Sequence, residues 1–263
     1  MRALCVTRQG DPVTPNVELM DLPEPLAGAG DLLVATEASA LNHLDLWVGR
    51  GLPGVDTAYP HIGGSDGCGR VVGVGQGVNE AWIGRRVMFN LAVEIPHVPS
   101  PESRPSGREI YMIGEHTPGT HAERFVAPAA NAIDVGDSTD PIQAAAYGLT
   151  HLTAWGMLCT KARLRCGDTV LITGIGGGVA LAALNIAMHF GCRTIVTSRH
   201  QKKLDRALEM GAADAVLDEG EDWSRTVRDL TGRRGVDICA DSIGAAVRSE
   251  EHTSELQSPC NLV

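Results

Sequence analysis

The sequence is poor in aromatic residues, with only 4% Phe, Trp and Tyr among 263 residues, so its core must be built chiefly from aliphatic side chains. It lacks a secretory signal and any long apolar run, which predicts a cytoplasmic protein without a membrane-spanning helix. It also lacks an excess of cations: 22 Lys and Arg stand against 32 Asp and Glu. Nucleic acids and anionic membranes are therefore excluded as main partners, because phosphate binding needs clustered positive charge.

The seven cysteines lack a pattern, since they form no CxxC pair and no cluster at metal-ligand spacing. This predicts reduced thiols and no structural zinc. What is present is ordinary for a globular chain: 43% apolar and 21% charged residues. The length is enough for one large domain or two ordinary ones.

The first half of the chain is divided by turns into short Val-rich runs. The segments 31–39 and 69–75 alternate partly between apolar and polar residues, which is typical of antiparallel strands. Residues 90–109 are rich in Pro and Ser, which predicts a surface loop. We therefore expect a β-rich domain over residues 1–135.

The second half changes period. Asp140 followed by Pro141 predicts a helix N-terminus, and a further helix is expected over 151–164. From Asp168 onward strand and helix patterns alternate strictly, which predicts parallel strands with right-handed crossovers. The fold class is thus α/β, with a β-rich domain followed by a doubly wound, Rossmann-type sheet over 136–247. The expected strands are 168–174, 193–198, 214–218 and 236–242, and the expected helices are 179–190, 202–211 and 223–232.

A glycine cluster, TGIGGGVA, stands between the first of these strands and the helix after it. Glycines at this place let the backbone approach a pyrophosphate, whose charge the helix N-terminal N–H groups stabilise. The pattern departs from G-x-G-x-x-G, because Val179 stands where the last Gly would be and the small Ala180 follows it. The predicted cofactor contacts of this turn are Gly174, Gly176, Gly177, Gly178 and Val179.

The end of the second strand carries no carboxylate. NAD sites usually place an acidic residue there to bind the ribose 2′-OH, and that residue would repel the 2′-phosphate of NADP. Here the chain has Ser198, Arg199 and Lys202 instead, which predicts NADPH as the cofactor. The alternative is that Arg199 and Lys202 form only the solvated first turn of a helix.

The ordered segments MRALCV, GAGDLLVATEASALNHLDLW, PHIGGSDGCGRVVGVGQGV, GTHAERFVAP, GLTHLTAW and GDTVLITGIGGGVA are similar to those of medium-chain dehydrogenases/reductases. The chain resembles the zinc-independent quinone oxidoreductase-like branch most closely, from Met1 to about Val247. The resemblance implies a GroES-like catalytic domain, a Rossmann domain, a nicotinamide held between them, and a homodimer or homotetramer.

Zinc-dependent members of that family carry a catalytic Cys and a His at positions that are Asn42 and Ser65 here. An amide and a hydroxyl lack the thiolate and imidazole that hold a catalytic zinc ion. The loop 90–109 likewise lacks the four cysteines of the family's structural zinc lobe. We therefore predict no metal site, and we interpret His43 and His61 as surface or hydrogen-bonded histidines.

Without zinc to polarise a carbonyl oxygen, the simplest hydride acceptor is an electron-poor one, such as a quinone or an α,β-unsaturated carbonyl. The resemblance implies that Asn42 helps to hold nicotinamide or substrate and that Thr153 lies beside the nicotinamide. For Asp45, a structural role, in which it bonds its own loop, is as well supported as a functional one. Leu52 stands where related proteins have a Tyr, so no proton donor can be assigned.

Two other functions stay open. Proteins of this fold can bind NADPH with little turnover and act as structural or interaction proteins, because fold does not fix function. A zinc-type alcohol dehydrogenase is disfavoured by Asn42 and Ser65.

The segment RSEEHTSELQS, from Arg248, has no apolar period and back-translates to a widely used sequencing-library adapter. We therefore expect residues 248–263 to be a non-native tail and the chain to be a truncated, inactive fragment of an NADPH-dependent reductase. The alternative is a genuine polar tail.

Overall fold

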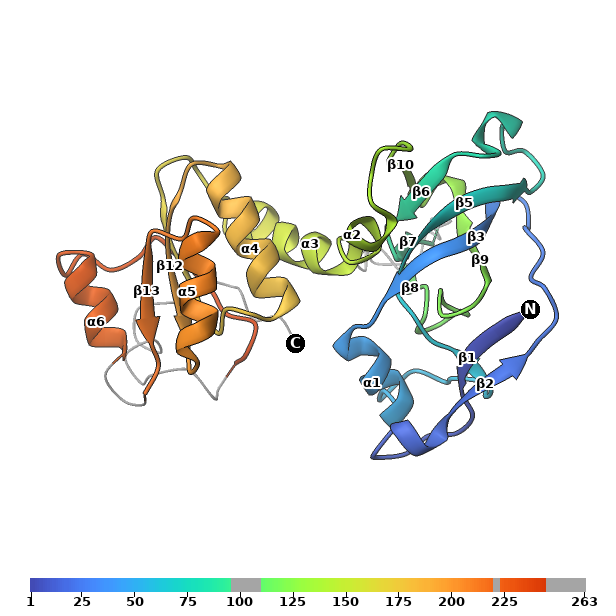
Figure 1. Cartoon of the computed structure of the whole chain (residues 1–263), viewed down its shortest axis with the longest axis horizontal. Helices are drawn as coiled ribbons and strands as arrows, with labels where there is room; N and C mark the ends of the chain where they lie inside the picture. The colour runs from blue at the N-terminus through green and yellow to red at the C-terminus, as the bar shows by residue number, and fades with distance from the viewer. Residues whose placement is uncertain (96–109, 220–222, 245–263) are drawn as a thin grey trace, which may run out of the picture. The chain divides into compact units, whose positions relative to one another are not determined.

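The computed structural model describes residues 1–95, 110–219 and 223–244, and it divides into two compact units, Met1–Leu149 and Thr150–Val263 (Figure 1). The division lies further along the chain than the predicted boundary at 135. The predicted tail 248–263 and most of the predicted loop 90–109 lie outside the described residues. Within the described part, every helix is too short or too polar to span a bilayer.

The first unit is β-rich. Its largest sheet has five antiparallel strands in the order β10-β6-β5-β3-β9, and smaller sheets have the orders β2-β1-β4 and β7-β8. Strand β7 occupies the start of the predicted loop, whose first residues are therefore extended rather than irregular. The strands are β1 (Arg2–Val6), β2 (Val17–Asp21), β3 (Asp31–Ala40), β4 (His61–Ile62), β5 (Asp66–Val74), β6 (Arg86–Phe89), β7 (Ala92–Glu94), β8 (Ile110–Met112), β9 (Arg124–Pro128) and β10 (Ala132–Asp134).

The core of the first unit follows the alternation of its strands. Leu32 and Val34 of β3 are fully buried, and the rings of Phe89 and Phe125 meet at a centroid distance of 5.2 Å. Two of the three phenylalanines of this aromatic-poor chain thus pack together in one place. Among its described residues this unit has two α-helices, α1 (His43–Arg50) and α2 (Pro141–Ala145).

Helix α2 explains where the units divide. Its N-cap is Asp140, whose side chain accepts a hydrogen bond from the N–H of Ile142, as the sequence predicts. Its buried Ala144 and Ala145 then pack against Cys68 of β5. The helix therefore belongs to the β-rich unit rather than to the Rossmann-type domain in which the sequence placed it.

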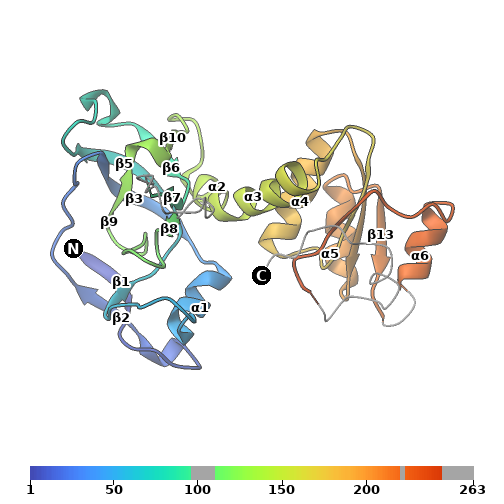
Figure 2. The same ribbon diagram turned by 180° about the vertical axis from the view of Figure 1, so that it is seen from behind.

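The second unit has the predicted strict alternation. Its four parallel strands have the order β13-β12-β11-β14. Figure 2 shows β13 between α5 and α6. The strands are β11 (Thr169–Ile172), β12 (Arg193–Ser198), β13 (Asp214–Leu217) and β14 (Ile238–Ala240), and the helices are α3 (Gly148–Trp155), which continues as a π-helical turn (Gly156–Lys161), α4 (Gly178–His189), α5 (Gln201–Glu209) and α6 (Trp223–Leu230).

This sheet is covered on both faces, because successive side chains of a strand point to opposite sides. Val170 and Ile172 of β11 belong to the core cluster that contains the apolar residues of α4 and α5. Leu171, between them, belongs to the cluster that contains Trp223 and Val227 of α6. The unit is therefore doubly wound, and its strands are apolar runs because both faces are buried.

Candidate active site

The glycine turn lies between β11 and α4, at the carboxyl edge of the parallel sheet. Gly174 and Gly176 have φ values of 63° and 110°, which side chains rarely adopt. Between them, Ile175 is 1% exposed, and its N–H donates to the carbonyl oxygen of Thr197 at 2.7 Å. The buried side chain of Ile175 and two hydrogen bonds to Thr197 of β12, the second from the N–H of Gly174 to Oγ1, thus fix the turn to the sheet.

The next two glycines keep the start of α4 open. A Cβ at Gly178 would lie 2.7 Å from Cγ2 of Thr150, so glycine allows α3 to pack here. A Cβ at Gly177 would meet nothing within 4 Å, and Gly177 caps α4 without a side-chain hydrogen bond. The first N–H groups of a helix have no partner within it. This turn can therefore receive an anion such as a pyrophosphate on its backbone.

The strand order places this turn at a topological switch point. β12 pairs with one side of β11 and β14 with the other, and ligands of open α/β sheets bind where the order reverses. The loop after β14 is ordered by Asp241, whose Oδ1 accepts from Thr173 Oγ1 at 2.9 Å and from the N–H of Ile243 at 2.9 Å. The side chain of Ile243 lies against Gly174, so the glycine is also required for this contact.

The three predicted specificity residues lie at the end of β12 and the start of α5. Ser198 is 5% exposed, and its Oγ accepts from the N–H of His200 at 3.2 Å. Arg199 and Lys202 are exposed, and neither makes an ion pair within the described part of the chain. Their charges are thus available to a ligand, while Ser198 shapes the turn.

Lys203 is a residue that the sequence analysis missed. A Cβ at Gly176 would lie 2.6 Å from Cδ of Lys203, so this exposed side chain lies over the glycine turn. Its place in the first turn of α5, next to Lys202, was the only local signal. Choosing between the two lysines needs the geometry of the turn, which lies more than twenty residues earlier in the sequence.

Asn42, in the first unit, is held at two points. Its Nδ2 donates to Oδ2 of Asp66 at 3.0 Å, and its backbone N–H donates to Oδ2 of Asp45 at 2.7 Å. Asp66 also accepts from the N–H of Leu149 at 2.7 Å. An ionised carboxylate only accepts hydrogen bonds, so the amide NH₂ faces Asp66. The Oδ1 of Asn42 faces the backbone N–H of Asp45 in the capping box of α1, and an amide oxygen has a second lone pair that a ligand can use.

The two carboxylates around Asn42 are shifted in opposite directions. Burial raises the pKa of Asp66 above its usual range, although the hydrogen bonds from Asn42 and Leu149 oppose this. Burial also acts to raise the pKa of Asp45, but the nearby imidazole of His121 and the hydrogen bonds from the N–H groups of Asn42 and Gly64 outweigh it and lower the pKa. The bonds to Asn42 and Gly64 confirm that Asp45 ties its own loop together.

The residues at the zinc-ligand positions do not fit a zinc ion. The amide of Asn42 is engaged by Asp66, and the buried hydroxyl of Ser65 has no hydrogen-bond partner. His61 Nε2 lies 3.0 Å from the carbonyl oxygen of Gly114, as expected for a hydrogen-bonded histidine. Over the described ranges, no three His, Cys, Asp or Glu side chains are grouped so that they could bind a metal.

The remaining predicted residues are placed within their own units. Thr153 is half-buried on α3, one helical turn after Thr150, which contacts the glycine turn. Leu52 packs against the apolar core of the first unit and offers no proton donor. The structure thus brings the glycines and Lys203 together in one unit, and Asn42 together with two acids in the other.

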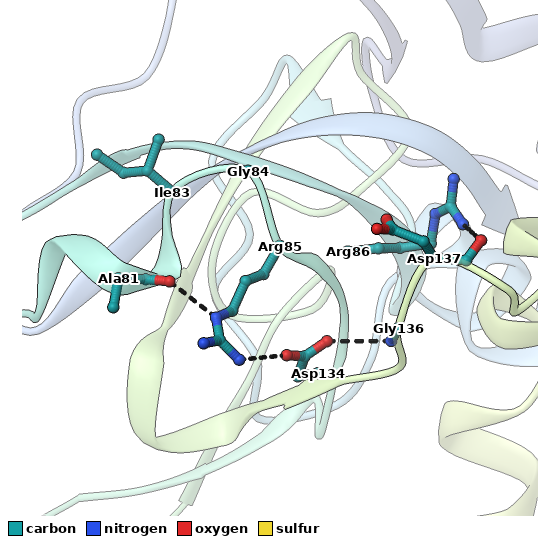
Figure 3. A pocket seen from close by; sticks show the side chains of 8 residues that line it. All are labelled: Ala81, Ile83, Gly84, Arg85, Arg86, Asp134, Gly136 and Asp137. Carbon is teal, nitrogen blue, oxygen red and sulfur yellow. Dashed lines mark hydrogen bonds and ion pairs between the residues drawn. The ribbon is translucent and has the colours of Figure 1, made fainter.

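A hollow elsewhere in the first unit is lined by charged side chains, but its arginines are already in ion pairs and are not available to a ligand (Figure 3). Its arginines are paired, since Arg85 bonds Asp134 at 2.6 Å and Arg86 bonds Glu37 at 2.6 Å. These ion pairs join β6 to β10 and β3. We interpret this hollow as a structural network rather than part of the site.

Two family models match the chain. Residues 28–137 match the alcohol dehydrogenase GroES-like domain, and residues 178–254 match a family described as zinc-binding dehydrogenase. The second match covers the second unit from α4 onward and contains neither Asn42 nor Ser65. The name of that family therefore says nothing about the zinc-ligand positions of this chain.

Solved structures and curated proteins agree with these matches. The chain is 37% identical to a structure described as an NAD-dependent alcohol dehydrogenase, with a TM-score of 0.81, covering 91% of this chain and 70% of that one. It is 31% identical to a mycobacterial protein complexed with NADPH, with a TM-score of 0.75, covering 93% and 68%.

Among curated proteins, it is 31% identical over 234 residues to the zinc-type alcohol dehydrogenase-like protein YogA of Leptosphaeria maculans, covering 84% of this chain and 64% of that protein. It is 25% identical over 238 residues to the quinone oxidoreductase of Rattus norvegicus, covering 90% and 65%. The chain thus spans less than two thirds of the length of both curated relatives.

Proposed function

Because this chain belongs to the medium-chain dehydrogenase/reductase superfamily of oxidoreductases, we propose that it serves zinc-independent, NADPH-dependent reduction of a quinone or an α,β-unsaturated carbonyl. The observation that carries this proposal is the engagement of Asn42 by Asp66 at a zinc-ligand position. The side chain of Asn42 is an amide that is already bonded to Asp66, so this position offers a metal neither a thiolate nor an imidazole. The reaction must then use an acceptor that needs no Lewis acid.

When bound, reduced nicotinamide supplies a hydride, and the residues of the chain hold and orient it. The backbone N–H groups at Gly177 and Gly178 receive the pyrophosphate, where the dipole of α4 favours negative charge. In the first unit, Asn42 offers Oδ1 as an acceptor, which suits the NH₂ of a nicotinamide carboxamide or a substrate hydroxyl. The fixed amide therefore positions a donor group rather than polarising a carbonyl.

The preference for NADPH rests on charge at the end of β12. Arg199 follows β12, and Lys202 and Lys203 lie in the first turn of α5; all three are exposed. No carboxylate stands at the end of β12, so these cations would attract a 2′-phosphate. The relatives differ in their cofactors, since one is described as NAD-dependent and another is complexed with NADPH. Measuring kcat/KM with both cofactors decides the question, and a preference for NADH would contradict this part of the proposal.

One variant sharpens the cofactor test. Ser198→Asp keeps an oxygen that can accept from the N–H of His200 and adds the carboxylate that the site lacks. We expect kcat/KM with NADPH to fall at least about 10-fold while that with NADH rises, because a ribose hydroxyl can bond the new carboxylate and a phosphate cannot. Asp205→Ala, at an exposed position of α5 away from the turn, is the control.

The reaction itself is tested by NADPH oxidation with three classes of acceptor: a quinone, an enone and a simple aldehyde. We expect turnover with the first two, no loss of rate with a zinc chelator, and a fall of at least about 10-fold for Asn42→Ala, which removes a positioning contact. Rapid turnover of the aldehyde that a chelator abolishes would establish an alcohol dehydrogenase instead. Tight NADPH binding with no acceptor reduced would establish a cofactor-binding protein.

Two broader predictions accompany this proposal. A homodimer or homotetramer is expected from the resemblance, and a cytoplasmic location is expected from the scattered cysteines, which form no CxxC pair in the sequence. Sedimentation of the purified protein tests the first, and fractionation of the source cells tests the second.

A further inference from the structure

A Ser, a His and an Asp lie in line in the first unit, and the Asp is Asp45, whose other carboxylate oxygen accepts from the backbone N–H of Asn42. Ser39 Oγ lies 3.0 Å from Nδ1 of His121, and Nε2 of the same ring lies 3.6 Å from Oδ1 of Asp45. Ser39 comes from the end of β3, Asp45 from α1 and His121 from the segment before β9. No sequence motif joins them, because they are brought together only by the packing of the sheet.

The imidazole is built into this place. The side chain of His121 is 9% exposed, and its buried Nε2 has no hydrogen-bond partner at normal distance. Its backbone N–H donates to the carbonyl oxygen of Gly63 at 3.0 Å. Gly64 has a φ of 98°, and a Cβ there would lie 2.7 Å from Nδ1 of His121. Gly64 thus provides the room that the ring occupies.

The charge of Asp45 selects the tautomer of His121. Hydrogen bonds from the N–H groups of Asn42 and Gly64 keep Asp45 in its ionised form. An anionic oxygen 3.6 Å from Nε2 favours the proton on that nitrogen, which leaves Nδ1 as an acceptor for the hydroxyl of Ser39. A base that is oriented by a third group and faces a hydroxyl is the arrangement that activates a serine nucleophile.

The hydroxyl faces a hollow that could hold a substrate. The hollow has a volume of about 520 Å³ and is lined by Ser39 and His121 together with three exposed leucines, Leu4, Leu19 and Leu41. At its rim Arg2 is paired with Glu123 at 2.8 Å, so this cation is neutralised. The lining is therefore mainly apolar around Ser39 and His121, with Thr36 and the Arg2–Glu123 ion pair as its other polar groups, which suits an uncharged molecule with a short hydrocarbon group.

We propose that Ser39 is a nucleophile that, with His121 as its base, hydrolyses small carboxylic esters with apolar acyl groups. Oγ of Ser39 bonds to the ester carbonyl carbon while its proton passes to Nδ1 of His121, and that proton then goes to the departing alcohol oxygen as the ester C–O bond breaks. Water next attacks the acyl carbon, giving its proton to Nδ1, and the acyl–Oγ bond breaks as Oγ recovers the proton. The net reaction is ester plus water to acid plus alcohol.

This activity needs no nucleotide and is separate from the proposed reduction. The test uses the full chain without NADPH, with p-nitrophenyl butyrate as substrate and a fluorophosphonate as a covalent probe. We expect release of p-nitrophenol above the buffer rate, a fluorophosphonate adduct on the peptide containing Ser39, and loss of both in Ser39→Ala. His121→Ala should lower the rate at least about 100-fold, the usual contribution of a general base.

Ser138→Ala is the matched control, because Ser138 is also an exposed serine of the first unit but has no histidine beside it in the described structure. It should keep the full rate and the adduct. Circular dichroism establishes that each variant is folded, and Ser39 is exposed, so its truncation should not disturb the core. The proposal is overturned if the folded wild-type chain forms no adduct on Ser39, or if Ser39→Ala hydrolyses the ester as fast as Ser138→Ala.

Discussion

The site in the second unit is made of backbone, whereas the site in the first unit is made of side chains. The glycine turn after β11 presents N–H groups and open space, and its side chains serve only to fix it to the sheet. Around Asn42, by contrast, the contacts are made by side chains: the carboxylates of Asp66 and Asp45 bond Asn42, and the imidazole of His121 lies beside Asp45. A backbone site tolerates changes of side chain except where a side chain would fill it, and a side-chain site depends on each partner.

The largest expected effect comes from filling the backbone site. In Gly177→Asp the new side chain would project beside the N-terminus of α4, where a Cβ meets nothing within 4 Å. We expect the Kd for NADPH to rise at least about 100-fold, because like charges at an interface cost several kcal/mol. Stability should not fall, since Asp is a good N-cap. Fluorescence titration with NADPH measures the change.

Gly177→Ser separates charge from bulk in the same place. It adds a small neutral side chain, so NADPH binding should weaken far less than in Gly177→Asp. Equal losses in the two variants would mean that bulk rather than charge is decisive. Unchanged binding in both would mean that the pyrophosphate does not lie on this turn.

The second effect comes from removing a partner in the side-chain site. Asp66→Ala leaves the Nδ2 of Asn42 and the N–H of Leu149 without their acceptor. We expect the free energy of unfolding to fall by about 2 kcal/mol, because a buried donor without a partner costs about 1–3 kcal/mol. Urea denaturation measures it. Glu37→Ala, in the exposed ion-pair network of the same unit, should cost less, and the reverse order would contradict the comparison.

The contrast also explains what could be predicted from the sequence. Gly174 to Gly178 are contiguous and stand between a strand and a helix, so local pattern predicts both the turn and its ligand. The partners of Asn42 come from elsewhere: Asp66 lies 24 residues along the chain, and Leu149 lies 83 residues beyond Asp66. Such contacts depend on sheet pairing, which no spacing rule gives.

The boundary between the units was missed for a related reason. The helix starting at Asp140 was predicted correctly, but a helix pattern does not say which sheet the helix packs against. Here Ala144 and Ala145 pack on Cys68, a contact between residues far apart in the sequence. Local chemistry predicts an element, and only tertiary packing assigns it to a unit.

A third prediction compares the two acids near Asn42. The pKa of Asp45 is lowered on folding, so its stabilising contribution is present above its unfolded pKa of about 3.9 and is lost as the pH falls through the folded value. The pKa of Asp66 is raised, so its contribution is present below about 3.9 and is lost as the pH rises through the folded value. The two carboxylates therefore give opposite slopes.

The measurement is the free energy of unfolding of Asp45→Asn and Asp66→Asn between about pH 3 and pH 7. The deficit of Asp45→Asn relative to the wild type should grow with pH to about 1.5 kcal/mol, the contribution of a hydrogen bond to a charged group. The deficit of Asp66→Asn should shrink over the same range. Slopes of the same sign in both variants would contradict the assignment of the two environments.

The smallest effect compares the two helix starts. The N-terminus of α2 is capped by a side chain, because Asp140 accepts a hydrogen bond from the N–H of Ile142. The N-terminus of α4 has no side-chain cap. Asp140→Ala should lower the free energy of unfolding by about 1 kcal/mol, the usual value of an N-cap, and leave NADPH binding unchanged. Asp140→Asn, which keeps a capping oxygen, should restore most of the loss. A change in NADPH affinity in Asp140→Ala would show that α2, a capped helix of the β-rich unit, also takes part in binding. The distinction between a capped N-terminus that only stabilises the fold and an uncapped one that binds the cofactor would then be wrong.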